Sequence, residues 1–468
     1  MRLLLPSLWN LAVPAMLCSA RVVNAVPASE EHFEPSDIIH RDVCVLGGGS
    51  TGTYAAIRLR DKGKSVVVVE RDDRLGGHSH GIRFPDGKGF DYGVQALLND
   101  GVTNDYLDRL GLEKVQHSPS TLNSDHINFK TGERVPPNSN TLEMGSGLVL
   151  FRQAIAKFDF LDEGIFDLPD PVPQELLRPF GEFVEKHHLE GMLELIFMFA
   201  HGLGNILEVP LLYVIGTFGI PQIDALLNLG YIRPNNGVAE IYTKAASALG
   251  HDVWYQTTAS RVIRSNDGVR IVVNGPDGKR KLIKAKKLLA TIPPTMDNLH
   301  GFDLDQTEKD IFMKWRWNSY YASVVNNTGI PDKTSAVNIY PSIQPGSLPT
   351  KPFQWHIDYM GVSGYLASKL VADEDFSAVD AKRMILDDIQ RMGEAGTYDS
   401  ADPQIVKFAD HTPTSMSVDA EEIRHGFYRG LYALQGQHST YWTGHSFCAD
   451  MSSLLWAYTD TVMDQMLA

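Results

Sequence analysis

Three glycines, Gly47, Gly49 and Gly52, form the pattern G-x-G-x-x-G, and the acidic residue Glu70 follows them. Glycines at this spacing allow a tight turn and let backbone N–H groups approach an anion. The first turn of a helix adds unpaired N–H groups and a positive dipole, which together bind phosphate. A carboxylate placed like that of Glu70 accepts hydrogen bonds from ribose hydroxyls. The spacing therefore predicts a dinucleotide site.

The elements around the glycines are those that such a site requires. Residues Asp42–Leu46 are apolar and partly β-branched, which indicates a buried parallel strand. Thr53–Lys62 carries apolar residues at helical spacing, and Ser65–Val69 is a second apolar strand. These elements form one βαβ unit, whose turn also contributes Ser50 and Thr51 to the predicted site. The alternative is a glycine-rich turn in an α/β domain that binds no nucleotide.

The residues after the acid distinguish one dinucleotide from another. A basic residue, Arg74, and the pair Gly76 and Gly77 follow it. This arrangement resembles the second glycine signature of flavoproteins with two dinucleotide-binding domains, and the resemblance implies FAD rather than NAD. Arg71 and His78 are assigned to the same cofactor site. The alternative for the glycine pair is an ordinary turn.

Size and composition indicate a large globular protein. The chain has 468 residues, of which 43% are hydrophobic and 21% charged, so it can bury an extensive core. Its formal net charge of −15 and the lack of basic clusters argue against nucleic acid or an anionic membrane as a partner. We expect a small-molecule substrate instead. Cys44 and Cys448 are expected to be small buried hydrophobes.

The N-terminus has the form of an export signal. Arg2 precedes a mostly apolar stretch and Val23–Ala25 fits a cleavage site, so residues 1–25 are predicted to be a signal peptide. The protein is then expected to be secreted or to stay in the lumen of the secretory pathway. The apolar stretch is too short for a bilayer span, so no membrane anchor is expected in the mature chain. Cleavage after Ala20 and a retained anchor are the alternatives, and Asn326 begins a glycosylation sequon.

The fold class predicted is α/β, or α+β overall, with a Rossmann-like FAD-binding domain and an inserted substrate domain of mixed sheet and helices. The predicted division is 26–40 as a leader, 41–130, 231–300 and 426–468 as the FAD-binding domain, and 131–230 and 301–425 as the substrate domain. Large apolar side chains nearly surround the predicted helices 174–188 and 189–203. Such helices are buried in a core or line a cavity for an apolar ligand. Lys281–Ile283 and Leu288–Pro294 are predicted as separate strands.

These segments resemble the flavin-containing amine-oxidase-like family, and within it the fungal β-cyclopiazonate dehydrogenase-type FAD oxidoreductases. The resemblance runs from about Arg41 to Leu467. It rests on the glycine turn with its acid, Arg74–His78, Asp91–Gln95, the strand and turn around Ser260, Ala290–Pro294, and Tyr441–Gly444 leading into Ser452–Leu455.

The resemblance implies further cofactor contacts. They are Gly93, Val94 and Gln95 beside the flavin ring, Ser260 and Arg261 at the adenine, and Gly444, Ser452 and Ser453 at the pyrimidine end of the flavin. The last three residues would bring a helix N-terminus to the place where reduced flavin gathers negative charge, which that terminus favours.

The chain also departs from the family pattern. Many amine oxidases carry a lysine on the strand before the catalytic cavity, where this chain has Val324 and Val325. The aromatic pair that frames an amine is not evident near Met451. Both departures place ordinary amine oxidation in doubt. His78 stands where many relatives have arginine.

Other chemistry has less support. Gly77–Gly81 matches G-x-S-x-G but lacks the preceding strand and following helix of a serine nucleophile. His78 and His80 can be interpreted as metal ligands, or His78 as a flavin attachment point, but hydrogen bonding near the pyrophosphate is favoured. No H-E-x-x-H or C-x-x-C pattern occurs, so no metal is expected. The aromatic residues in 315–321 form either a substrate wall or part of the core.

These observations predict an FAD-dependent oxidoreductase that removes a hydride from a bulky apolar molecule, such as an indole alkaloid or terpenoid. Gln95 is assigned as a hydrogen-bond partner of the flavin ring and His445 as a proton carrier, with structural hydrogen bonding as the alternative for both. An amine oxidase or a C–C desaturase of the same family is the nearest alternative. A non-catalytic flavin-binding protein is the alternative of another class.

Overall fold

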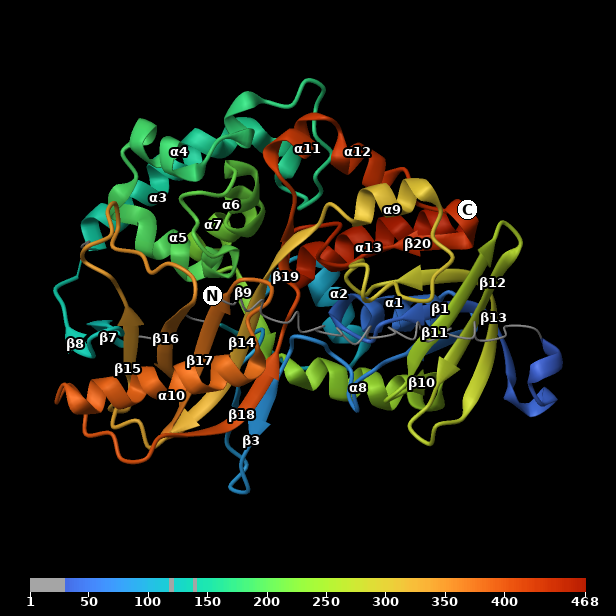
Figure 1. Ribbon diagram of the computed structural model, residues 1–468, viewed down its shortest axis with the longest axis horizontal. Coiled ribbons are helices and arrows are strands. Elements are labelled where there is room, and N and C mark those ends of the chain that lie inside the picture. Colours follow the sequence, from blue (N-terminus) through green and yellow to red (C-terminus); the bar gives the residue numbers. More distant parts are fainter. Residues whose placement is uncertain (1–29, 118–121, 138–140) are drawn as a thin grey trace, which may run out of the picture.

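Two large β-sheets stand side by side, each covered by helices (Figure 1). The computed structural model describes residues 30–117, 122–137 and 141–468. The predicted signal peptide, residues 1–25, and the first residues of the predicted leader lie outside these ranges. The mixture of helices and sheets confirms the predicted α/β fold class.

A seven-stranded sheet holds the glycine turn. Its order is β10-β2-β1-β13-β12-β11, and β20 pairs with β13. The strands are β1 Ile38–Leu46, β2 Val66–Val69, β10 Val253–Trp254, β11 Thr258–Ser265, β12 Gly268–Asn274, β13 Arg280–Ala290 and β20 Thr440–Trp442. The strands β10, β2, β1, β13 and β20 run parallel, whereas β12 and β11 are antiparallel additions. Since the carboxyl ends of β1, β2 and β20 meet at one edge, segments far apart in the chain converge there.

Helices pack on this sheet through apolar faces. The helix α1, Ser50–Asp61, contacts the C-terminal helix α13, Ser452–Leu467. Tyr54 stacks on Trp456 with 5.6 Å between ring centroids and donates a 2.7 Å hydrogen bond to Asp460. The neighbouring helices are α2 Gly101–Arg109, α8 Ala239–Leu249 and α9 Gln306–Phe312.

The second large sheet has eight strands. Its order is β18-β14-β17-β16-β15-β7-β8, and β19 pairs with β14. The strands are β18 Gln404–Asp410, β14 Arg316–Asn326, β17 Tyr365–Ala372, β16 Phe353–Tyr359, β15 Thr334–Asn338, β7 Asn123–Asn128, β8 Glu133–Arg134 and β19 Thr414–Ser417. In Figure 1, the helix α10, Ala378–Glu394, lies below this sheet, and a group of helices lies above it. That group is α3 Thr141–Ile155, α4 Phe180–His187, α5 Leu193–Ala200, α6 Leu211–Thr217 and α7 Ile220–Leu227.

Short elements connect these bodies. They are β3 Gly81–Arg83, β4 Gly89–Asp91, β5 Leu97–Leu98, β6 Lys114–Gln116, β9 Tyr231–Pro234, α11 Ala420–Arg424, α12 Phe427–Tyr432 and the 3-10 helix η6 His201–Leu203. The described residues include no helix with the length and apolar character that crossing a bilayer requires.

Two element predictions differ from the structure. The two predicted strands at Lys281–Ile283 and Leu288–Pro294 are one strand, β13, because the intervening lysines lie in the same continuous ladder with β1. The predicted helix 174–188 is interrupted, since Pro179 lacks an N–H and α4 begins only after it. The prediction that Cys44 and Cys448 are buried is confirmed, and neither forms a disulfide.

The domain limits stay a prediction. The segments 41–130, 231–300 and 426–468 contain the strands of the seven-stranded sheet except for the start of β1, which lies in the predicted leader. However, β7, inside 41–130, belongs to the eight-stranded sheet, where it pairs with β15 in parallel.

Candidate active site

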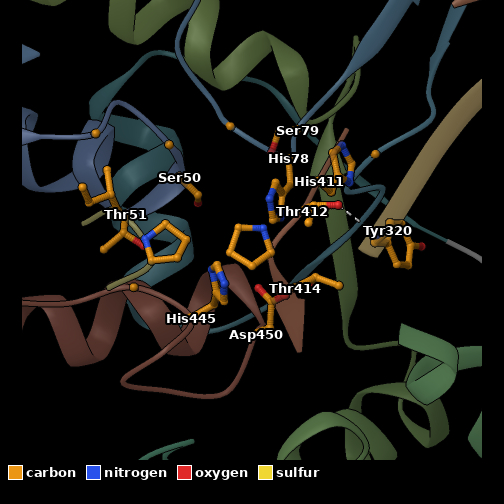
Figure 2. Close-up of a pocket in the computed structure, with 18 of the residues that line it drawn as sticks. Ser50, Thr51, His78, Ser79, Tyr320, His411, Thr412, Thr414, His445 and Asp450 are labelled. Carbon is orange, nitrogen blue, oxygen red and sulfur yellow. Dashed lines mark hydrogen bonds between the residues drawn. The ribbon is translucent and has the colours of Figure 1, made fainter. Parts of the chain in front are cut away.

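A pocket of about 940 Å³ lies between the two sheets and receives residues from both. The seven-stranded side contributes the glycine turn, the residues after β2, and the start of α13. The other side contributes residues of η6, β14, β17 and the segment 408–416. His78, Tyr320, His411 and His445 surround the same space in Figure 2.

The glycine turn presents the start of α1 to the pocket. Gly47, with φ of +104°, makes the turn that an L side chain would strain. Gly49 is the N-cap residue of α1 and lines the pocket together with Ser50 and Thr51. A Cβ built on Gly49 would meet nothing closer than Gly77 Cα at 3.9 Å, so the space in front of the backbone is open. The first N–H groups of a helix have no partner within it, and here they face that open space.

Gly52 has a different place. It does not line the pocket, and a Cβ there would lie 1.9 Å from Gly47 O. This residue therefore lets α1 pack closely against the turn, whereas Gly49 keeps the anion position clear.

Glu70 follows β2 directly and lines the pocket. Its Oε2 accepts a 2.5 Å hydrogen bond from Gly48 N–H, and its Oε1 accepts a 2.8 Å bond from Asp72 N–H. Burial raises the pKa of this carboxyl, and the two backbone donors oppose that shift. Each oxygen keeps further lone-pair capacity for a ribose hydroxyl.

Arg74 supports the second glycine turn. It donates 3.0 Å hydrogen bonds to the carbonyls of Leu75 and Ser79 and a 2.5 Å bond to that of Gly77. The guanidinium thus holds Gly76–His80 in shape, while Arg71 is solvent-exposed at the pocket rim.

Four histidines gather beside this turn. The His78 ring stacks on His411 at 4.5 Å and lies 5.8 Å from the His445 ring. His80 Nδ1 lies 3.1 Å from His411 Nε2. Burial lowers the pKa of His78 to about 4, to which repulsion from His445 contributes. Burial and then the charge of Arg74 lower the pKa of His80 to about 3, and burial takes the pKa of His411 well below its ordinary value.

His445 is oriented for a partner that the protein does not supply. It lines the pocket, and its Nε2 is buried without a hydrogen-bond partner among the described residues. A buried polar atom of this kind implies a ligand group or water at that position. The described part of the chain contains no cluster of three or more side chains able to hold a metal ion.

One part of the remaining wall is apolar. Phe166, Phe199, Leu203, Tyr213 and Met416 line it. The helical segment around α5 contributes both to the core and to the cavity wall. Leu193, Ile196 and Phe197 are buried in the core, whereas residues toward its C-terminal end line the cavity. Of the aromatic residues in 315–321, Tyr320 alone lines the pocket, and its hydroxyl lies 2.9 Å from His201 Nε2.

Several predicted site residues lie elsewhere. Gln95 does not line the pocket, because the chain leaves it after Val94 toward β5. Ser260 and Arg261 do not line it, whereas Gln256–Ala259 do. Ser260 Oγ donates a hydrogen bond to Val272 O at 3.2 Å. The predicted residues found in the lining are Gly47, Gly49, Ser50, Thr51, Glu70, Arg71, Arg74, Gly76, Gly77, His78, Gly93, Val94, Gly444, His445 and Ser452.

Ser453 also faces away from the pocket. Its Oγ accepts hydrogen bonds from Leu98 N–H at 3.0 Å and from the Thr103 hydroxyl at 2.8 Å. Through these hydrogen bonds Ser453 fixes the start of α13 against β5 and α2. It therefore supports the pocket without lining it.

The sequence analysis missed Lys369, His411 and Thr412–Ser415. β14 carries valines where a lysine was sought, but the adjacent strand β17 brings Lys369 opposite Ala322 and into the pocket. A single lysine inside the apolar strand Tyr365–Ala372 was the available signal.

Comparisons with known proteins agree with this geometry. The family model for flavin-containing amine oxidoreductases matches residues 51–319. The chain is 45% identical to the beta-cyclopiazonate dehydrogenase of Aspergillus flavus over 92% of this chain and 94% of that protein. It is 36% identical to the FAD-dependent oxidoreductase oblC of Cochliobolus heterostrophus, with 93% of each chain covered. Among solved structures, a fatty acid isomerase from P. acnes that produces CLA superposes with a TM-score of 0.74 at 17% identity, covering 92% of this chain and 99% of that one.

The residues of the pocket fit FAD. The open face at Gly49 and the first turn of α1 suit a pyrophosphate, and Glu70 suits a ribose. The start of α13, at Ser452, also opens onto the pocket, and a helix N-terminus suits the electron-rich edge of the flavin ring. The pocket volume leaves an apolar region beyond this cradle, bounded by Phe199 and Tyr213.

Proposed function

The chain belongs to the flavin-containing amine oxidoreductase family and is an FAD-dependent oxidoreductase, and on this premise we propose that it dehydrogenates a bulky, largely apolar small molecule. The observation that carries the proposal is the apolar wall that continues directly from the cofactor cradle in one pocket. A relative that is 45% identical is named for a reaction on beta-cyclopiazonate, and this name supports a bulky secondary metabolite as the substrate.

Different residues along the pocket have different roles in this proposal. The N–H groups at Gly49–Thr51 bind the phosphates, and Glu70 binds a ribose. FAD bound there supplies the acceptor for a hydride from a substrate carbon. The apolar wall holds that carbon in place and excludes water. His445 Nε2 takes the proton that leaves when the substrate gains a double bond.

The proposal is tested by mixing the anaerobic yellow protein with candidate substrates and following the flavin absorbance. Beta-cyclopiazonate and other fused-ring indole compounds are one arm, and simple primary amines such as benzylamine and putrescine are the other. We expect bleaching with the first arm only. Bleaching by the amines alone would show that this chain is an amine oxidase and would overturn the proposal.

We also propose that the protein enters the secretory pathway, which the composition of residues 1–25 supports. N-terminal sequencing of protein from the culture medium tests this, and an intact N-terminus in a cytosolic fraction would contradict it.

A further inference from the structure

Lys369 lines the pocket, and the proposed oxidation gives it no role. It lies in the middle of β17, between Ala322 of β14 and His356 of β16. Side chains alternate between the two faces of a strand, so Lys369 shares its face with Tyr320 of the adjacent strand, and both line the pocket. The ammonium group is therefore carried to the substrate side of the cavity.

Lys369 forms no hydrogen bond or ion pair with the residues that the structure describes. Within the described residues, no carboxylate or other acceptor is paired with its Nζ. The acid that acts on it, Asp358, forms its ion pair with His356, with Nδ1 and Oδ2 2.9 Å apart, and also accepts a hydrogen bond from the Ser335 hydroxyl. Each oxygen of Asp358 thus already contacts another group, and among the described residues Asp358 forms no ion pair with Lys369.

The neighbours of Lys369 in the pocket do not neutralise it. Burial lowers the pKa of His201 well below its ordinary value, with a further contribution from Lys369. Burial also lowers the pKa of His411, and Lys369 contributes to that shift after His78, His80 and Arg74. Burial also lowers the pKa of Lys369 itself, which Asp358 opposes only in part. A half-buried ammonium that lacks an ion pair is partly desolvated without compensation, and an anion that enters the pocket offsets that cost.

We propose that Lys369 binds an anionic oxygen group of the substrate, a carboxylate or an acidic enol, and so sets which bulky molecules are accepted. That the bound anion is the substrate rests on the proposed function, whereas the binding of an anion to Lys369 does not require that it be oxidised. With a formal net charge of −15, the protein as a whole does not attract anions, so their recognition requires a local group. The apolar wall and this cation on the substrate side of the pocket together select an acid with a large hydrocarbon body.

The test is a titration of the FAD-loaded protein, read from the shift in flavin absorbance as ligand enters the pocket. The probes are 2-naphthoate and its neutral analogue 2-naphthamide, followed by 4-hydroxycoumarin and coumarin, which separate a carboxylate from an acidic enol. We expect wild type to bind at least one acid more tightly than its neutral analogue. In Lys369→Met, that acid should lose at least about tenfold in affinity, because a charge-assisted contact is lost, while the neutral analogue changes by less than about twofold.

Lys407→Met is the matched control, since Lys407 is an exposed lysine on β18 of the same sheet and does not line the pocket. It should leave all four affinities unchanged. Equal losses for acid and neutral probes in Lys369→Met would indicate a general positioning role and would overturn the proposal. The same conclusion follows if wild type prefers no acid.

A second measurement is independent of the choice of probe. Removing a half-buried charge that has no ion pair should leave the melting temperature of the FAD-loaded, ligand-free protein unchanged or raise it. A fall of several degrees in both Lys369→Met and Lys369→Gln would mean that the lysine has a partner inside the protein, which contradicts the proposal. Flavin content is measured for each variant, so a failure of FAD binding or of flavin reduction is distinguished from a failure at Lys369.

Discussion

Two glycines only a few residues apart serve the cofactor site in different ways. Gly49 has φ of −64°, which any residue adopts, and its missing side chain leaves open the space where we place the phosphates. Gly52 has backbone atoms against the place where a side chain would begin. A substitution at Gly49 should therefore prevent FAD binding, whereas a substitution at Gly52 should destabilise the fold.

We expect Gly49→Val to fold but to lose bound FAD. Gly52→Ala should lower the free energy of unfolding by at least about 2 kcal/mol, since its Cβ overlaps Gly47 O. Flavin absorbance per mole of protein and urea unfolding of the flavin-free forms measure the two effects. A Gly49→Val protein that keeps its full flavin content would contradict the assignment of the phosphate site.

The start of α13 depends on contacts made by residues near the other end of the chain. Ser453 joins it to β5 and α2, and Ser50 Oγ accepts a 3.1 Å hydrogen bond from Trp456 Nε1. The helix that supplies Ser452 to the pocket is thus positioned by the βαβ region and by residues just after it.

Ser453→Ala should cost about 1–3 kcal/mol of unfolding free energy, because Leu98 N–H is left buried without an acceptor. We also expect the protein to release FAD more readily, as the start of α13 loses its attachment. Thr461→Ala, at an exposed position of the same helix, is the control. Dialysis against flavin-free buffer measures retention, and equal retention in both variants would exclude this role of Ser453.

The elements that could be predicted are those specified by neighbouring residues. The βαβ unit follows from an apolar run, three glycines and a second apolar run, all within one short stretch. Lys369 and His411 could not be placed, because their positions depend on the register of β17 and β18 against β14. That Ser260 does not line the pocket could not be foreseen, because the turn before β11, which determines which residues face the pocket, leaves no clear mark in the sequence.

The molecule as a whole buries several neutral histidines between its two sheets. An unfolded histidine titrates near pH 6.5, whereas burial holds the pKa of His78 at about 4. Between these values the unfolded chain binds protons that the folded protein does not. The free energy of unfolding therefore falls as the pH is lowered from about 6.5 toward 4.

For one such histidine, the slope approaches about 1.4 kcal/mol per pH unit. Urea midpoints between pH 7 and pH 5 measure it. We expect a shallower slope in His78→Asn and an unchanged slope in His251→Asn, because the His251 side chain is 95% exposed. A His78→Asn protein with the wild-type slope would show that His78 is protonated in the folded state.

The seven-stranded sheet combines β1, which begins at Ile38, with β20, which begins at Thr440. During synthesis, the nascent chain exposes the glycine turn long before the ribosome has made the segment that completes the pocket. Cofactor loading must therefore wait until translation is nearly finished. A ribosome-bound chain stalled before Thr440 would carry an intact phosphate turn and still capture no flavin.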